Sequence, residues 1–302
     1  MRKYLHYILA LLLVMAASGL MAQSDLLFSN PGINPGTYNP ASINSNGMIN
    51  LHLLARQQWI GFPDAPSLQR IGAEHFFEDQ SMGIKFNLMN LVAGKEITRQ
   101  LNLSYAYRVN FSEQMTLHLG LSAGFYNRLM KYSELIFYDG SEPLIKEDES
   151  FLRPDFEFGA EFNWKYFTAG LAANHITTPA RKATNFKIPV HNHFYIGYRL
   201  IVSDETALQT NLSWHRQGTI SQFQLDANLL FGNIFQAGMG LRTNDALIIH
   251  TGLNINEFFG IMYSYDLGIT RFSNYNSGTH EFMLLLRLNK HNPTYLSPRF
   301  MD

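Results

Sequence analysis

The stretch LNLSYAYRV at residues 101–109 decides the fold class, because its apolar and polar side chains alternate residue by residue. Strict alternation places every apolar side chain on one face of a β-strand. The same period recurs at 117–125, 156–164, 223–231, 259–269 and 282–288. We expect about fourteen strands in an all-β chain, beginning near residues 47, 67, 80, 98, 114, 154, 166, 191, 206, 219, 234, 245, 258 and 277.

Alternation of this kind fits either a soluble sandwich with a dry core or an outer-membrane barrel. The strands are about ten residues or longer, as a tilted membrane span requires. Aromatic residues near strand ends suit a girdle at the membrane interface, namely Tyr126, Trp164, Phe231 and Phe272. The polar face mixes Gly, Ser, Asn, Gln and charges too freely for a dry interior. We therefore predict a transmembrane antiparallel β-barrel over residues 47–290.

The lengths of the connections assign a side of the membrane to each of them. An even number of strands places both ends of the barrel in the periplasm. The periplasmic connections are then tight turns, at 112–113, 164–165, 203–205, 232–233 and 256–257. The long connections then all fall on the extracellular side, at 56–66, 131–153 and 179–190. This sorting by parity favours a barrel over a sandwich.

The two ends of the chain carry separate expectations. Basic residues precede an apolar run and small residues, which is typical of a secretory signal peptide over 1–22. The run is shorter than a membrane-spanning helix. Residues 23–46 are rich in Asn, Pro and Gly, and we expect a periplasmic or lumenal segment; whether it plugs the lumen or forms a disordered leader is open. Residues 291–302 are expected to be a periplasmic C-terminal tail. The chain has no cysteine, so it has no structural disulfide.

Composition and motifs argue against several classes of function. Lys and Arg number 23 and Asp and Glu 24, with no basic run, so we expect no nucleic-acid partner. The phosphate-binding loop, the nucleophile elbow and the zinc-protease helix motif are absent from the sequence. His191 and His193 share a strand face but have no third ligand nearby in sequence. We expect no catalytic residues, no cofactor and no metal.

An enzyme on the outer wall of a barrel would need histidine and serine side chains facing lipid. Here His118, His215 and His250 fall in the polar, lumen-facing register. The same face carries both signs of charge, whereas a selective pore often shows a ring of one sign. Mixed charge suits internal salt bridges or a plug, and it leaves a channel open as an alternative. The charged residues in this register are Arg108, Arg199, Arg242, Arg287, Asp155, Glu157, Glu161, Asp226 and Glu281.

Five short motifs carry a resemblance to a known family. They are NPA at 39–41, RQQWIGF at 56–62 with PDAP at 63–66, LSYAY at 103–107, YSYD at 263–266 and GTHE at 278–281. In this order they resemble the PorP/SprF family of outer-membrane proteins, found in bacteria with type IX secretion and gliding motility. The resemblance covers essentially the whole chain after residue 22. Thr279 replaces the expected serine, and NPAS replaces the more usual NPAYAG.

The resemblance implies a non-enzymatic barrel that acts as a component of the secretion machinery or as a cell-surface anchor for a secreted adhesin. The partners it implies are outer-membrane lipid, a secreted adhesin or its C-terminal domain, and periplasmic type IX machinery or a peptidoglycan-linked protein. Outer-membrane location follows from the barrel and the export signal. The alternative function is an outer-membrane channel or porin-like transporter.

The candidate partner-binding residues lie in the first extracellular connection and in the tail. Pro63 and Pro66 end strand pairing there, because proline lacks the N–H that a ladder needs. The aromatic residues either anchor the barrel rim in the membrane interface or form a recognition surface with the residues before them. The full set is Arg56, Gln57, Gln58, Trp59, Gly61, Phe62, Pro63, Pro66, Arg299 and Phe300.

Overall fold

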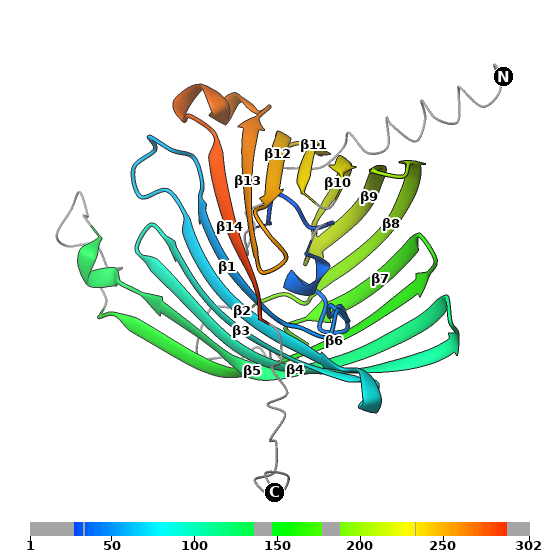
Figure 1. Cartoon of the computed structure of the whole chain (residues 1–302). Helices are drawn as coiled ribbons and strands as arrows, with labels where there is room; N and C mark the ends of the chain where they lie inside the picture. Colours follow the sequence, from blue (N-terminus) through cyan, green and yellow to red (C-terminus); the bar gives the residue numbers. More distant parts are fainter. Residues whose placement is uncertain (1–26, 33, 136–146, 177–187, 233, 289–302) are drawn as a thin grey trace, which may run out of the picture.

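A computed structural model describes residues 27–32, 34–135, 147–176, 188–232 and 234–288. Fourteen antiparallel strands close into a barrel in which each strand pairs with its neighbours in sequence and β1 pairs with β14 (Figure 1). This confirms the predicted fold class. Among the described residues, no helix has the length and apolar character to cross a membrane.

The strands are β1 Ile49–Gln57, β2 Ser67–Phe77, β3 Met82–Ala93, β4 Glu96–Ser112, β5 Met115–Met130, β6 Glu149–Trp164, β7 Phe167–Asn174, β8 His191–Ser203, β9 Thr206–Gln217, β10 Ile220–Phe231, β11 Phe235–Arg242, β12 Ala246–Asn254, β13 Phe259–Gly268 and β14 Thr279–Leu288. Four short 3-10 helices lie outside the strands: η1 Pro35–Thr37, η2 Glu78–Gln80, η3 Tyr132–Glu134 and η4 Arg271–Tyr275.

The largest error in a predicted strand start is at β6, which begins at Glu149 instead of near residue 154. Pro154 lies inside the strand, where it pairs with Phe125. The described β6–β7 ladder runs from Phe158 to Trp164, and the Ile176 N–H donates to the Phe156 carbonyl beyond it. Pro154 lies outside this described ladder, and proline is tolerated in a strand where its missing N–H is not needed for pairing.

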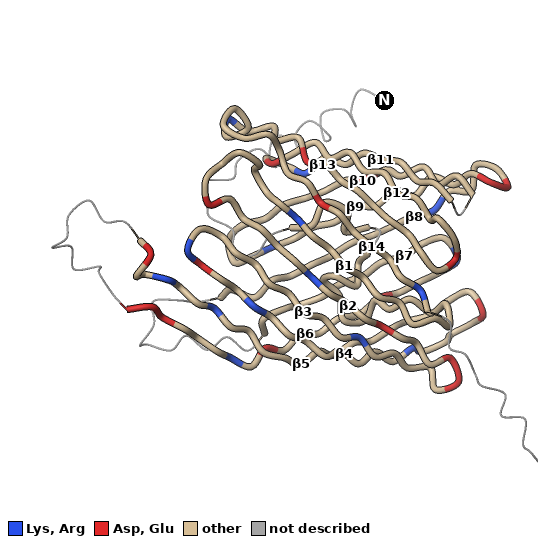
Figure 2. Tube along the Cα trace, turned by 60° about the vertical axis from the view of Figure 1, so that its left-hand side comes forward, with Lys and Arg blue, Asp and Glu red and all other residues tan. Residues whose placement is uncertain are grey.

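The alternation along each strand separates two environments. On β4 and β5, Leu103 and Leu121 are exposed on the outer wall, whereas Ser104 and Ser122 are buried inside. An apolar outer face and a polar interior are the reverse of a soluble sandwich and match an outer-membrane barrel. Figure 2 shows acidic residues at several turns at the ends of the barrel, and long uncharged runs along the strands.

Of the four residues predicted to form the aromatic girdle, two are exposed at strand ends, one lies in a connection at the extracellular end and one is buried inside the barrel. Trp164 and Phe231 are exposed at strand ends, as expected. Tyr126 was wrongly placed: it is buried inside the barrel, with its ring 5.4 Å from the ring of His175, because its register on β5 faces inward. Phe272 lies in η4, in the connection between β13 and β14.

Residues 27–32 and 34–43, here called the lumenal plug, run through the interior of the barrel, where Figure 1 draws them in dark blue. Leu27, Phe28 and Tyr38 of the plug form one apolar cluster with side chains of the barrel wall. The wall is shaped to fit the plug: a Cβ atom on Gly120 would lie 2.3 Å from the backbone nitrogen of Ala41. The plug therefore fills part of the lumen, beside a cavity of about 450 Å³ lined by Gly32 and Asn34 of the plug and by Tyr195 and Asn211 of the wall. The wall members of the cluster are Leu54, Leu68, Leu91, Met262 and Met283.

Candidate functional site

An ion-pair cluster lies inside the barrel near the extracellular ends of the strands. Arg56 is 3% exposed and points into the lumen. Its Nη2 donates to Asp266 Oδ2 at 2.8 Å, and its Nη1 donates to Glu281 Oε2 at 3.0 Å. Arg242 reaches the same Asp266 oxygen at 3.3 Å. Buried charges are stable only when they are paired and hydrogen-bonded, so each member of this cluster depends on the others.

The lumenal plug completes the ion-pair cluster through Phe28 and Ser29. The Ser29 N–H lies 3.2 and 3.0 Å from the two carboxylate oxygens of Glu281, and the Ser29 hydroxyl accepts a hydrogen bond from Arg56. Arg242 Nη2 donates to the Phe28 carbonyl at 2.7 Å. The first residues of the plug are thus held by charge-assisted hydrogen bonds, which are about twice as strong as neutral ones.

A second attachment holds the middle of the plug. Lys85, on β3, points inward and donates to the carbonyls of Gly36 at 3.0 Å, Asn39 at 2.8 Å and Ser42 at 2.9 Å. An ammonium group has three N–H donors, and all three are used here. Three carbonyl dipoles compensate the buried charge, and in return the lysine fixes the path of seven consecutive residues, 36–42.

The NPA motif forms the turn of the plug that contacts the opposite wall. Asn39 Oδ1 accepts the Ala41 N–H at 2.9 Å, which closes an Asx-type turn. Asn39 Nδ2 donates to the Ala160 carbonyl at 3.1 Å and to the Tyr195 hydroxyl at 3.0 Å. Within the plug itself, the Tyr38 hydroxyl accepts the Phe28 N–H at 2.6 Å. Burial raises the pKa of the Tyr38 phenol above its usual range, so the phenol remains neutral.

Motifs far apart in the sequence meet in this interior. Arg56 begins RQQWIGF, Asp266 ends YSYD and Glu281 ends GTHE, and these three residues are the centre of the ion-pair cluster. Asn39 of the NPA motif lies in the plug that covers them. Four of the five motifs that carry the family resemblance therefore contribute to the plug or to the ion-pair cluster that holds it, whereas LSYAY lies on β4 with Leu103, Tyr105 and Tyr107 on the outer wall.

Two of the lumenal histidines, His193 and His215, pair with each other and contact the plug. His118, His215 and His250 are buried inside, which confirms their predicted register. His193 and His215 approach with their Nδ1 atoms 2.6 Å apart, so one ring donates and the other accepts, and the Tyr38 ring stacks 4.6 Å from the ring of His193. No group of three or more His, Cys, Asp or Glu within the described ranges is arranged to hold a metal.

The first extracellular connection is paired with the last one. The Ile60 N–H donates to the Gly278 carbonyl at 2.9 Å, and the Ser277 N–H donates to the Ile60 carbonyl at 2.7 Å. The Trp59 N–H lies 3.2 Å from the hydroxyl of Thr279, the residue that replaces the expected serine. The chain then reverses at Gly61, whose φ of 89° favours glycine.

These two connections present aromatic and apolar side chains at the extracellular end of the barrel. The Trp59 and Phe62 rings lie 4.8 and 5.0 Å from the ring of Phe272, both in edge-on contact. Ile60 and Tyr275 are exposed beside them. We call this group, Trp59, Ile60, Phe62, Phe272 and Tyr275, the aromatic rim.

The structure separates the predicted partner-binding residues into groups. The side chains of Arg56 and Gln58 are buried, so neither is part of the surface of the connection. The backbone N–H of Gln58 donates to the Pro66 carbonyl at 2.8 Å. Gln57 is exposed on the outer wall. The residues that remain exposed or partly exposed in the connection are Trp59, Gly61, Phe62, Pro63 and Pro66. Arg299 and Phe300 lie outside the described residues.

Two members of the aromatic rim, Ile60 and Tyr275, and the attachment of the plug were not predicted from the sequence. Phe272 was expected in the girdle, and its contact with the Trp59 ring follows from the neighbouring positions of β1 and β14, which close the barrel. Arg242 and Glu281 were expected in the lumen, and both are buried there, as are the other four acidic residues predicted to face inward. Their pairing with the plug had no local signal.

A closed barrel with an apolar outer wall defines an outer-membrane β-barrel protein. Solved structures of similar fold include the Ralstonia pickettii toluene transporter TbuX, at 9% identity and a TM-score of 0.53, covering 84% of this chain and 92% of that chain. The CymD monoaromatic hydrocarbon channel is similar at 11% identity and a TM-score of 0.50, covering 86% and 93%. At such identities the likeness concerns the fold alone.

The sequence comparison then identifies the family. The family model for the type IX secretion system membrane protein PorP/SprF matches residues 20–286, and this chain belongs to that family. None of the curated proteins matches the chain. The predicted family is confirmed, and with it a place among the outer-membrane components of type IX secretion.

Proposed function

We propose that this protein is a non-enzymatic anchor of the type IX secretion system, which holds a secreted protein at the cell surface through the aromatic rim. The observation that carries the proposal is the plug inside the lumen. The chain's own residues 27–32 and 34–43 lie in the interior, and four cationic side chains hydrogen-bond to them, namely Lys85, Arg56, Arg70 and Arg242. A barrel closed by its own chain suits a fixed platform better than an open pore.

The chemistry of the aromatic rim supports a protein partner. Trp, Tyr and other large side chains contribute most of the energy at protein interfaces. Phe62 is 41% exposed and Tyr275 73% exposed, although both are large and partly apolar. Backbone pairing between the two connections holds the rim in place before a partner binds, which lowers the entropy lost on binding. The carboxyl-terminal domain of a secreted adhesin is the partner we propose.

Affinity purification of the tagged full-length protein from outer membranes tests the proposal. We expect a large secreted protein to co-purify, together with periplasmic machinery. A barrel that purifies alone from cells that secrete actively would contradict an anchoring function.

Replacing Trp59 with alanine distinguishes the two functions left open for the rim. We expect the Trp59→Ala barrel to remain stable and to lose at least about 2 kcal/mol of partner binding, roughly a 30-fold weakening, as for an interface hot spot. The readouts are thermal stability in detergent and the amount of co-purified partner. Trp164→Ala is the matched control, since Trp164 is an exposed tryptophan at the periplasmic edge. Lost stability with retained partner would assign Trp59 to membrane anchoring.

Deleting residues 291–302 tests the periplasmic side. We propose that this tail docks secretion machinery, on the grounds of its two prolines and the adjacent Arg299 and Phe300. The deleted protein is expected to assemble as a barrel and to lose only its periplasmic partners on purification. Failure of the barrel itself to assemble would refute a docking function for the tail.

A further inference from the structure

The outer wall of the barrel is hollowed over strands β12, β13, β14, β1 and β2. The hollow has a volume of about 590 Å³ and an almost wholly apolar lining. A volume of this size lies within the range of small-molecule sites, roughly 300–1,000 Å³. The wall faces the hydrocarbon of the membrane, so what occupies the hollow is apolar. Outward-facing residues of the lining include Leu53, Ala55, Ile71, Ile261, Phe282 and Leu284.

A hydrogen-bonded ladder of polar side chains crosses the same wall. Arg99 Nε donates to Asn90 Oδ1 at 3.4 Å, Asn90 Nδ2 donates to Gln69 Oε1 at 2.9 Å, and Gln69 Nε2 donates to Ser67 Oγ at 2.8 Å. These residues come from β4, β3 and β2, close to the extracellular ends of the strands. All four side chains point outward from the barrel, and Gln69 also lines the hollow.

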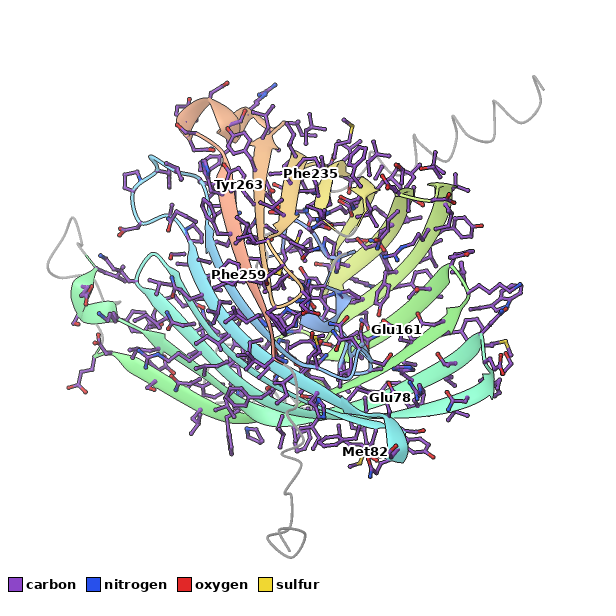
Figure 3. All side chains as sticks on the ribbon, in the orientation of Figure 1. Glu78, Met82, Glu161, Phe235, Phe259 and Tyr263 are labelled. Carbon is purple, nitrogen blue, oxygen red and sulfur yellow. The ribbon has the colours of Figure 1, made fainter. Side chains whose placement is uncertain are left out.

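Polar groups also flank the other side of the hollow. Tyr263, which lines it, has its hydroxyl 2.7 Å from His280 Nδ1 (Figure 3 labels Tyr263 on β13). The Tyr265 ring lies 5.0 Å from the His280 ring. A lipid-facing arginine costs roughly 2–4 kcal/mol at the bilayer midplane but little near the interface. The ladder and this tyrosine–histidine group therefore lie at the level of the lipid head groups, with the hollow beside them.

We propose that this part of the wall binds an anionic, multiply acylated glycolipid of the outer leaflet, of the lipid A type. The hollow takes an acyl chain, and the amides of Gln69 and Asn90 meet sugar hydroxyls. Arg99, exposed at the end of the ladder, meets a phosphate. The combination of an apolar recess with several amides and one cation, on the face that the fold immerses in the membrane, selects a lipid with a sugar head group.

Native mass spectrometry of the full-length protein, with purified lipid A added in detergent, tests this proposal. Ala55→Trp fills the hollow, and Arg99→Leu removes the cation. Each is expected to weaken lipid A binding at least about tenfold. Ala123→Trp is the control for the first variant, because Ala123 faces outward on β5 away from the hollow. Arg216→Leu is the control for the second, because Arg216 is exposed at the extracellular end of β9.

The same measurement with phosphatidylglycerol separates a glycolipid site from general lipid contact. Unchanged binding in both controls, with weaker binding in both test variants, supports the site. Equal losses in test and control variants would overturn it, as would phosphatidylglycerol binding as tight as lipid A. The gel shift of each barrel on heating reports whether it is folded. If Ala55→Trp misfolds, Ala55→Leu takes its place, and if Arg99→Leu misfolds, Arg99→Gln takes its place.

Discussion

Arg56→Ala is expected to destabilise the barrel by about 3–5 kcal/mol, the usual cost of removing one partner from a buried ion pair. The substitution leaves the carboxylates of Asp266 and Glu281 inside the lumen without their shared cation. It also removes the hydrogen bond to the Ser29 hydroxyl, so the beginning of the plug loses one of its attachments. Arg242 remains beside Asp266 but does not replace Arg56 at Glu281.

Urea titration of the folded, heat-modifiable species in lipid vesicles measures this loss. Arg128→Ala is the control, since Arg128 pairs with Glu96 in a partly exposed position and such pairs contribute about 1 kcal/mol or less. The double variant Arg56→Met with Glu281→Gln removes the charge of both partners of the ion pair. It is expected to recover part of the stability that Arg56→Ala loses. If the Arg56→Ala protein is no less stable than the Arg128→Ala control, water already screens the charges of the ion-pair cluster.

The wall of this barrel is predictable from sequence, because the period of two assigns each residue to a face without knowledge of its neighbours. In LNLSYAYRV the leucines and tyrosines lie outside and the polar side chains inside, as expected, and the small Ala106 takes an inward position beside Ile43 of the plug. The pattern weakens on β1, where Leu53 and Leu54 are consecutive. Leu53 is exposed to lipid, whereas Leu54 faces inward and packs in the cluster with Leu27, Phe28 and Tyr38 of the plug.

The path of the plug was not predictable, because its hydrogen-bond partners come from strands far away in sequence. Ser29 meets Glu281, and Asn39 meets Tyr195. Residues 23–46 show neither the two-residue period of a strand nor the 3.6-residue period of a helix, so nothing local distinguishes a lumenal segment from a periplasmic one. For the same reason RQQWIGF was read as one surface, although Arg56 faces the lumen and Phe62 the exterior. A strand end places consecutive side chains on opposite sides, and only the closed barrel shows where that strand ends.

Deleting residues 27–43 is expected to convert a silent barrel into a steady pore. Barrels of eight strands are filled by their own side chains and those of 16–18 strands hold an aqueous channel, so a barrel of fourteen strands has an interior that something must occupy. In this protein the plug occupies it. Without the plug, Lys85, Arg242 and Glu281 would face water, which solvates charges well, so the wall keeps a stable interior.

Planar-bilayer recording of the full-length and shortened proteins measures the difference, and the gel shift on heating verifies that both barrels are folded. Lys85→Ala is an intermediate case: it removes three hydrogen bonds from the middle of the plug and leaves the Ser29 attachment in place, so we expect brief openings. Steady conductance by the full-length protein would favour transport over anchoring. A folded but silent shortened barrel would show that the wall's own side chains close the lumen, and the plug would then serve chiefly to stabilise the ion-pair cluster beneath the aromatic rim.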